Sequence, residues 1–243
     1  MLVYRPIATE LVARSPHPLT GRTVLDAGAG TGAASTALAS VGAHPLATDF
    51  SWDMLAWEAE DRPPCAVADV RALPVATAAV DDTVAAFVLN HLLDPAAGFA
   101  ELVRVTRPGG AVLVSVFSNA SQSDVRDRVD ELAMEEGWQV PDWYQEMRNK
   151  AAPLLGSAAD MEAAARTAGL VDVAVDEQAV DVGVTEPEQL VAYRFGQAQF
   201  APWLDRIGPE RAGEFRRRTV EAIRPIMEPY CPIVVFLAAR RTA

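Results

Sequence analysis

Short runs of β-branched and aliphatic residues alternate with alanine-rich stretches of helical periodicity through the first half of the chain. Such alternation is typical of βαβ units, in which helices pack on a parallel sheet. The run at 82–89 is almost wholly apolar, which indicates a strand buried on both faces. The pattern predicts strands at 23–27, 43–49, 65–68, 82–89 and 111–117, and helices at 31–41, 51 to about 60 (with Ser51 as N-cap) and 96–106.

The second half of the chain is less regular. Residues 119–155 and 186–230 are predicted to be mostly helical, the latter broken at Gly208-Pro209 and Pro225. A helix at 158–168, a strand within 171–182 and a last strand at 233–238 complete the pattern. Because no internal repeat or low-complexity linker interrupts the chain, residues 1–243 are expected to form a single α/β domain.

Charge and composition exclude several function classes. With 21 Lys and Arg against 33 Asp and Glu, the net charge is −12, which disfavours a nucleic-acid partner. No apolar run reaches the roughly 20 residues of a membrane span, and the N-terminus lacks a secretory apolar region, so a cytoplasmic protein without a membrane partner is expected. Cys65 and Cys231 are far apart and the three histidines are scattered, so we expect buried reduced thiols and no metal site.

The candidate chemistry begins with VLDAGAGTG at 24–32, where a predicted strand turns into a helix. Its three glycines allow a tight turn and close approach of a ligand, and the helix N-terminus offers free N–H groups. Asp49 ends the next strand, 21 residues after Gly28, where a carboxylate can accept hydrogen bonds from both hydroxyls of a ribose. Asp69 ends the third strand and can accept from an adenine amino group. The carboxyl ends of these strands share one edge of the sheet, so the sequence predicts a nucleoside site there.

Two nucleotide ligands fit this loop. Gly28, Gly30 and Ala33 also match the dinucleotide pattern GxGxxG/A, which would indicate an NAD-dependent oxidoreductase. Asp26, however, stands two residues before the first glycine, where its charge would repel phosphates and favour a cationic amino group. A ligand with ribose, adenine, an ammonium group and no phosphate is S-adenosylmethionine.

With these motifs the chain resembles class I S-adenosylmethionine-dependent methyltransferases of the ubiquinone/menaquinone-biosynthesis type. The resemblance implies S-adenosylmethionine as cofactor and S-adenosylhomocysteine as product. It also implies a Rossmann-like, mostly parallel sheet of seven strands in the order 3-2-1-4-5-7-6, with helices on both faces. The matching segments are VLDAGAGTG (24–32), TDFSWDML (48–55), ADVRALP (68–74), VDDTVAAFVLNHLLDP (80–95) and ELVRVTRPGGAVLVSVF (101–117).

The resemblance assigns a role to each motif residue. The glycine loop and Asp26 would surround the methionine part of the cofactor, and the residues after strands two to four would contact ribose, adenine and sulfonium. His91 would lie beside the acceptor as a general base, although an orienting or lining role is equally compatible with its position. The expected cofactor-binding residues are Asp26, Gly28, Gly30, Gly32, Asp49, Phe50, Met54, Asp69, Val70 and Asn90.

The same strand order implies that two long insertions, 118–156 and 183–231, emerge at the ligand edge and form a helical lid over the substrate. Polar and aromatic residues of this lid are the expected substrate contacts: Trp138, Trp143, Tyr144, Tyr193, Arg194, Gln197 and Trp203. No NPPY or DPPY follows strand four, where the chain has NHLL, which disfavours methylation of a planar amino group in adenine or glutamine.

The function expected from the resemblance is methyl transfer to a small organic acceptor, in specialised (natural-product) metabolism, by a monomer or homodimer. Whether oxygen, nitrogen or carbon is methylated stays open. The alternatives are a methyltransferase-fold protein with a non-methylating activity, such as a cyclase, and the NAD-dependent oxidoreductase.

Some residues are expected to be structural. Asp81 and Asp82 open the fourth strand at the far edge, where a solvated turn is predicted. Pro108-Gly109-Gly110 is predicted to be a turn at that same edge, and Trp52 and Trp57 are predicted to pack against the adenine helix.

Overall fold

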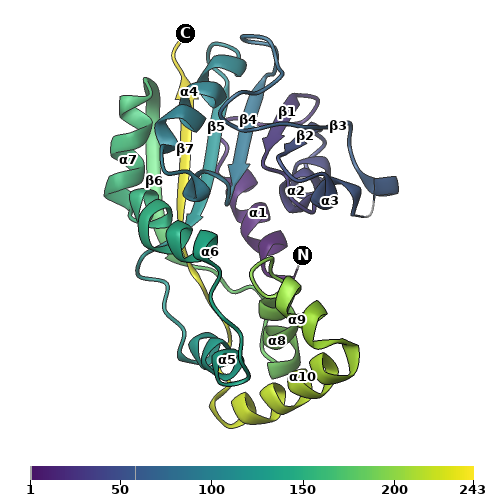
Figure 1. Ribbon diagram of the computed structural model, residues 1–243. Helices are drawn as coiled ribbons and strands as arrows, with labels where there is room; N and C mark the ends of the chain where they lie inside the picture. The colour runs from purple at the N-terminus through teal and green to yellow at the C-terminus, as the bar shows by residue number, and fades with distance from the viewer. Residues whose placement is uncertain (1, 58) are drawn as a thin grey trace.

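The computed structural model describes residues 2–57 and 59–243. In this part of the chain, seven strands form one sheet in the order β3-β2-β1-β4-β5-β7-β6 (Figure 1). The first five strands are parallel, and β7 is antiparallel to both of its neighbours. This confirms the predicted fold class and strand order. The strands are β1 Thr23–Ala27, β2 His44–Asp49, β3 Cys65–Val67, β4 Asp82–Ala86, β5 Ala111–Phe117, β6 Leu170–Ala179 and β7 Ile233–Arg241.

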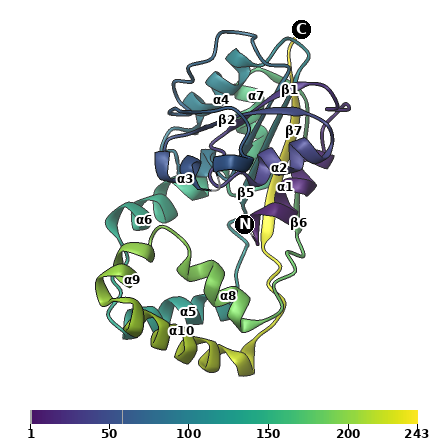
Figure 2. The same ribbon diagram turned by 90° about the vertical axis from the view of Figure 1, so that its right-hand side faces the viewer.

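Helices cover both faces of the sheet (Figures 1 and 2). On one face, α1 (Tyr4–Ala13) and α2 (Ala33–Ser40) bury apolar residues in a core shared with β1, β5 and β7. On the other face, α4 (Pro95–Val105) and α7 (Ala158–Thr167) contribute to a second core. The short α3 (Trp52–Ala56) lies beside β2 and β3. None of the described helices is long and apolar enough to cross a membrane.

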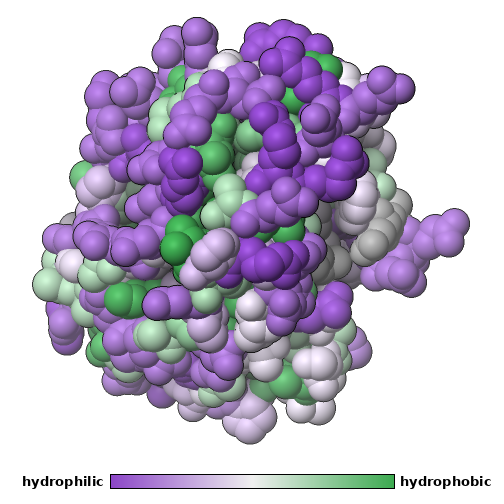
Figure 3. Space-filling model, turned by 90° about the horizontal axis from the view of Figure 1, so that it is seen from below, coloured by the Kyte–Doolittle hydropathy of each residue, from purple (hydrophilic) through white to green (hydrophobic). Residues whose placement is uncertain are grey.

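A separate group of helices lies beyond the lower end of the sheet, where both views place α5, α8, α9 and α10 (Figures 1 and 2). We call it the helical layer. β7 begins at this lower end of the sheet, and its residue Val234 pairs with Phe117, the last residue of β5. The parallel strands therefore end here, at the carboxyl edge of the sheet. The outer face of the layer is mostly hydrophilic, with small scattered apolar patches (Figure 3). Its elements are α5 Asp124–Glu135, α8 Pro187–Phe195, α9 Ala201–Ile207, α10 Pro209–Ile223 and a 3₁₀ turn at Arg224–Ile226. After α5 the chain returns to the sheet through α6 Asp142–Glu146, a π-helical turn at Met147–Ala151 and a 3₁₀ turn at Ala152–Leu155, and Leu155 is part of the second core.

Element boundaries differ from the predicted ones where the chain leaves the sheet. β4 ends at Ala86, because Phe87 adopts a left-handed φ of 58° and the chain then forms a 3₁₀ turn at Leu89–His91. α3 ends at Ala56 rather than near residue 60, and a 3₁₀ turn covers Ala59–Asp61. The N-cap prediction is confirmed, since Ser51 Oγ accepts a hydrogen bond from Met54 N at 3.3 Å.

Asp82 is a clear correction, because it is fully buried and does not lie in a solvated turn. Its carboxylate accepts hydrogen bonds from Arg22 Nε at 2.5 Å and from the backbone N–H of Ala111 at 2.7 Å, and it lies 2.8 Å from His17 Nε2. Asp82 therefore joins three segments at the amino edge of the sheet. Its neighbour Asp81 accepts from Thr23 N at 2.8 Å.

Two further predictions about burial are wrong. Cys65 and Cys231 are exposed rather than buried, because β3 is an edge strand and residue 231 lies outside the sheet. Trp52 and Trp57 are 68% and 60% exposed, so neither ring is the packing residue that was predicted. Alternating apolar sequence cannot distinguish a ring that packs on a neighbour from one that stays at the surface.

Candidate functional site

The glycine loop lies at the carboxyl edge, between β1 and α2. Gly28, Gly30 and Gly32 have φ values of 73°, 53° and 89°, a region that residues with a Cβ rarely adopt. A Cβ on Gly28 would lie 2.5 Å from Val88 Cβ, so only glycine fits there. The N–H groups of Gly28 and Ala29 donate to the Thr48 carbonyl at 2.8 and 2.9 Å. The loop is therefore a fixed turn held between the ends of β2 and β4.

Asp49 ends β2 beside this loop. One carboxylate oxygen accepts from Gly30 N and the other from Ser51 N, both at 2.8 Å. Each oxygen keeps a further lone pair, so the carboxylate is held in place and can still accept hydrogen bonds from two hydroxyl groups. Met54 lies close to this loop, because its Cε would be 3.5 Å from a Cβ placed on Gly30.

Two buried acceptors lie at the ends of the adjacent strands β1 and β4. Asp26 is fully buried, and its Oδ2 accepts from Ser35 Oγ at 2.6 Å, whereas Oδ1 has no partner among the described residues. Asn90 is 7% exposed, and its Oδ1 is likewise without a donor in the described part of the chain. Burial is the main cause that raises the pKa of Asp26 to about 6. Because buried acceptors normally have donors, this pair fits a ligand that supplies N–H groups.

The residues expected around adenine are partly open to solvent. Phe50 is 78% exposed and Met54 is 43% exposed, whereas Val70 is buried. Asp69 forms an ion pair with Arg71 at 2.6 Å, and this contact lowers the pKa of the Asp69 carboxyl. The arrangement offers an apolar ring and a carboxylate beside the ends of β2 and β3, which suits a planar heterocycle with an amino group.

His91 closes the 3₁₀ turn after β4, and its backbone N–H donates to Val88 O at 3.0 Å. His91 is exposed to solvent at this edge. Partial desolvation of its ring lowers the pKa of the imidazole, and the Asp49 carboxylate opposes this shift. The net direction is downward, which favours the neutral imidazole, the form that can accept a hydrogen bond.

Two of the expected substrate contacts pack inside the helical layer instead of lining a site. Trp138 is 4% exposed, stacks on Phe200 with ring centroids 4.1 Å apart, and donates from Nε1 to the Gln199 carbonyl at 3.0 Å. Trp203 is equally buried and meets Phe215 edge-on at 5.3 Å. We therefore leave Trp138 and Trp203 out of the proposed substrate site.

Arg194 joins the two insertions. It is 4% exposed and forms an ion pair with Asp130 of α5 at 2.6 Å, and it also donates to the Gln197 side chain. The Asp130 carboxylate and a hydrogen bond with Tyr144 raise the pKa of Arg194 despite the opposing effect of burial. Trp143 is half exposed, and its ring centroid lies 5.7 Å from that of Tyr144.

An aromatic cluster that the motifs did not indicate lies between the carboxyl edge and the helical layer. Phe87 and Phe117, after β4 and at the end of β5, have ring centroids 4.4 Å apart. Tyr4 of α1 lies 5.2 Å from Phe87 and 6.0 Å from Tyr193, which lies 5.8 Å from Tyr230. Tyr193 and Tyr230 of this cluster come from the insertion that was expected to contact the substrate. The only sign of this cluster in the sequence is that Phe87 and Phe117 lie at the ends of predicted strands.

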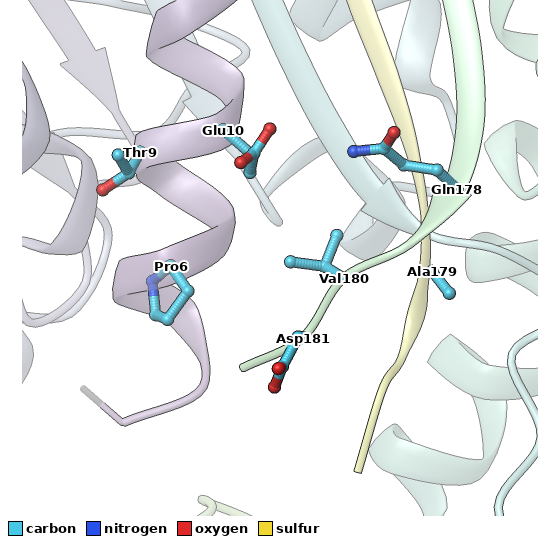
Figure 4. A pocket seen from close by; sticks show the side chains of 7 residues that line it. All are labelled: Pro6, Thr9, Glu10, Gln178, Ala179, Val180 and Asp181. Atoms are coloured by element: carbon cyan, nitrogen blue, oxygen red, sulfur yellow. The ribbon is translucent and has the colours of Figure 1, made fainter. Parts of the chain in front are cut away.

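Two open hollows on the described surface lie elsewhere. One, of about 360 Å³, is bounded by Pro6 and Glu10 of α1 and by Gln178 and Asp181 at the end of β6 (Figure 4). The other, of about 600 Å³, lies between α8 and α10. None of the expected cofactor-binding residues lines either hollow.

Comparisons with known proteins indicate a methyltransferase domain. Residues 25–114 match the family model of a methyltransferase domain. The demethylmenaquinone methyltransferase of Clavibacter sepedonicus is 37% identical over 122 residues, which are 48% of this chain and 50% of that protein. The chain thus spans about half the length of the curated relatives it matches.

Solved structures share the fold over nearly the whole chain. A putative methyltransferase from an antibiotic biosynthesis pathway of Anabaena variabilis superposes with a TM-score of 0.64 at 17% identity, covering 96% of this chain and 98% of that one. Phosphoethanolamine N-methyltransferase 2 of Haemonchus contortus, in complex with phosphomonomethylethanolamine and S-adenosylhomocysteine, gives 0.60 at 19% identity, covering 98% and 52%. Residues 25–114 thus resemble a methyltransferase domain, and the fold of the whole chain is the one found in these solved methyltransferase structures.

Proposed function

We propose that the protein transfers a methyl group from S-adenosylmethionine to a small organic acceptor. The observation that carries this proposal is the pair of buried acceptors, Asp26 Oδ1 and Asn90 Oδ1, which lack a donor in the described structure. They lie beside a glycine loop at the strand ends where α/β sheets bind ligands. An ammonium group provides the donors that Asp26 lacks, and phosphates would be repelled there.

The chain's own residues would hold and orient this cofactor, whose sulfonium supplies an activated methyl group. Asp26 would accept from the ammonium, Asp49 from the ribose hydroxyls, and Asp69 from the adenine amino group. Phe50 and Met54 would cover the adenine faces, and their exposure would fall on binding. Methyl transfer to a well-aligned nucleophile needs mainly positioning and exclusion of water, which this edge and the helical layer would provide.

The acceptor is proposed to bind between the carboxyl edge and the helical layer, with insertions 118–156 and 183–231 acting as its lid. The aromatic cluster around Phe87 and Phe117 favours a flat, largely apolar acceptor such as a quinone-like ring. The similar demethylmenaquinone methyltransferases are named for a quinone substrate. Their similarity to this protein covers about half of each chain. The neighbour from an antibiotic pathway supports an acceptor from specialised metabolism.

Replacing Asp49 with alanine tests the cofactor site. We expect Asp49→Ala to weaken S-adenosylhomocysteine binding 10- to 100-fold in titration calorimetry, because hydrogen bonds to an ionised acceptor contribute about 1.5–3 kcal/mol. Asp53→Ala, an exposed carboxylate four residues further along, is the matched control and should bind normally. Equal affinity of the wild type for NAD, or an unchanged dissociation constant in Asp49→Ala, would contradict the assignment. Turnover with a panel of phenols, amines and carbon acids then tests methyl transfer itself.

His91 is expected to assist the reaction without being essential. We expect His91→Gln to slow single-turnover methyl transfer less than about tenfold, because alignment suffices for an acceptor that is already nucleophilic. A general base would instead contribute about 10²–10⁴-fold. The wild-type rate would then fall only at pH values below 6.5, since the imidazole pKa is lowered and only the neutral ring accepts a proton. Loss of that acidic limb in His91→Gln, with a large drop in rate, would make His91 the base.

A further inference from the structure

Arg62 lies against the glycine loop with one guanidinium nitrogen unused. The residue follows the 3₁₀ turn at Ala59–Asp61, and its Nε and Nη2 donate to the carbonyls of Trp57 and Met54 at 3.0 and 2.6 Å. Its Nη1 is buried and has no acceptor among residues 2–57 and 59–243. If Gly32 carried a Cβ, Arg62 Nη1 would lie 3.7 Å from it. A buried, charged donor without a partner is costly, so this nitrogen points to an acceptor that a ligand supplies.

The unused nitrogen belongs to the same loop as the unused oxygen of Asp26. The charge of Arg62 acts on the Asp26 carboxylate and opposes the effect of burial on it, yet Oδ1 and Nη1 are both without partners and so do not bond to each other. A buried carboxylate oxygen and a buried guanidinium nitrogen, both without partners in the described structure, thus lie beside one turn. A zwitterionic group, with an ammonium and a carboxylate on a single carbon, provides a donor for Asp26 Oδ1 and an acceptor for Arg62 Nη1.

We propose that Arg62 Nη1 binds the α-carboxylate at the amino-acid end of S-adenosylmethionine, while Asp26 accepts from its ammonium. This inference rests on the proposed function and adds a residue that no motif of the family segments contains. Two backbone carbonyls already hold the guanidinium, so little side-chain freedom is lost when the third nitrogen binds. Arg62 also offsets Asp26 and Asp49, whose charges would otherwise repel a carboxylate.

Arg62 would therefore act as a specificity residue of the cofactor site. It would favour adenosyl compounds that carry the whole amino-acid tail over those that lack its carboxylate. It would also connect cofactor binding to the segment after α3, because the same guanidinium bonds to Met54 and Trp57.

Ligands that differ in the tail test this role. Calorimetry on the full chain would compare S-adenosylhomocysteine with decarboxylated S-adenosylmethionine, which keeps an ammonium and lacks the carboxylate. We expect Arg62→Ala to weaken S-adenosylhomocysteine binding 10- to 100-fold and to change binding of the decarboxylated ligand less than about twofold. Arg62→Lys should lie between, since a lysine keeps the charge and loses the planar fork. Arg166→Ala, an exposed arginine of α7 paired with Glu162, is the control and should leave both ligands unaffected.

The other outcomes overturn the assignment in distinguishable ways. Equal weakening of both ligands by Arg62→Ala would make Arg62 a structural support of the segment after α3. Tighter binding would mean that the guanidinium occupies ligand space and must leave. If the wild type binds neither ligand, the proposed function itself fails, and the carboxylate site fails with it. Thermal unfolding of each variant shows whether the fold is kept.

Discussion

Asp130→Ala is expected to lower the free energy of unfolding by about 3–5 kcal/mol, because it leaves the guanidinium of Arg194 buried without its counter-charge. The side chains of Arg194 and Asp130 are only 5% and 16% exposed, and the pair joins α8 to α5. Since these helices belong to different insertions, the substitution removes one of the contacts between the two insertions, while Trp138 and Phe200 still stack across them. Urea unfolding monitored by circular dichroism gives the change in free energy.

The same variant tests whether the helical layer selects the acceptor. S-adenosylhomocysteine should still bind to folded Asp130→Ala at low temperature, because the glycine loop and Asp49 belong to the sheet edge. Acceptor turnover should fall. Glu131→Ala, the next residue of α5, removes a surface pair with Arg128 and should change little. Parallel loss of cofactor affinity and turnover in Asp130→Ala would show that the layer stabilises the whole fold and is not a separate lid.

Asp82→Ala is expected to lower the free energy of unfolding by about 3 kcal/mol while leaving the ligand edge intact. The substitution removes the acceptor of the Ala111 N–H, and an unsatisfied buried donor costs about 1–3 kcal/mol. It also removes the contacts of Asp82 with Arg22 and His17. A hydrogen bond to a charged group contributes about 1.5–3 kcal/mol. These partners are 34% and 25% exposed and can turn to water, so the losses do not add in full.

Asp82 lies at the edge of the sheet opposite the glycine loop, which makes it a stability site and not a catalytic one. The dissociation constant of S-adenosylhomocysteine should therefore be unchanged in folded Asp82→Ala. Glu162→Ala, which removes an exposed pair on α7, serves as the control for loss of a carboxylate. A variant with wild-type stability would mean that water replaces the Asp82 network.

The strands of the first half were predictable because their signal is local. β1 and β5 have the predicted boundaries, since a run of β-branched residues between turn formers is visible within a short window. β4 was predicted three residues too long, because Val88 and Leu89 are as apolar as the strand itself but follow the left-handed turn at Phe87. α1 is absent from the predicted elements, although Ile7, Ala8, Leu11 and Val12 have the spacing of a buried helix face.

The candidate cofactor residues stand out in the sequence because they lie near strand ends. Asp26 and Asp49 are within the last two residues of β1 and β2, and Asn90 lies in the 3₁₀ turn after β4. Parallel strands end at a common edge, so Asp26, Asp49 and Asn90 must come close together once the strand order is correct. Arg62 follows no strand and matches no motif, and its position depends on how the chain turns back after α3. The lid residues were least predictable, because an aromatic residue in an amphipathic helix packs inward or faces a ligand according to its neighbours. Trp138 and Trp203 pack inward.

By itself the sequence determined the places of most strands along the chain, the glycine loop and the acids near the strand ends, because these depend on local spacing and on the fixed geometry of parallel sheets. Only the tertiary structure decided which polar atoms are buried without partners, since satisfaction of a donor or acceptor depends on residues far away in the chain. It joined Arg194 to Asp130 across 64 residues and His17 to Asp82 across 65. It also brought Tyr4 beside Tyr193 and Arg62 against Gly32, contacts that arise only when separate elements pack together.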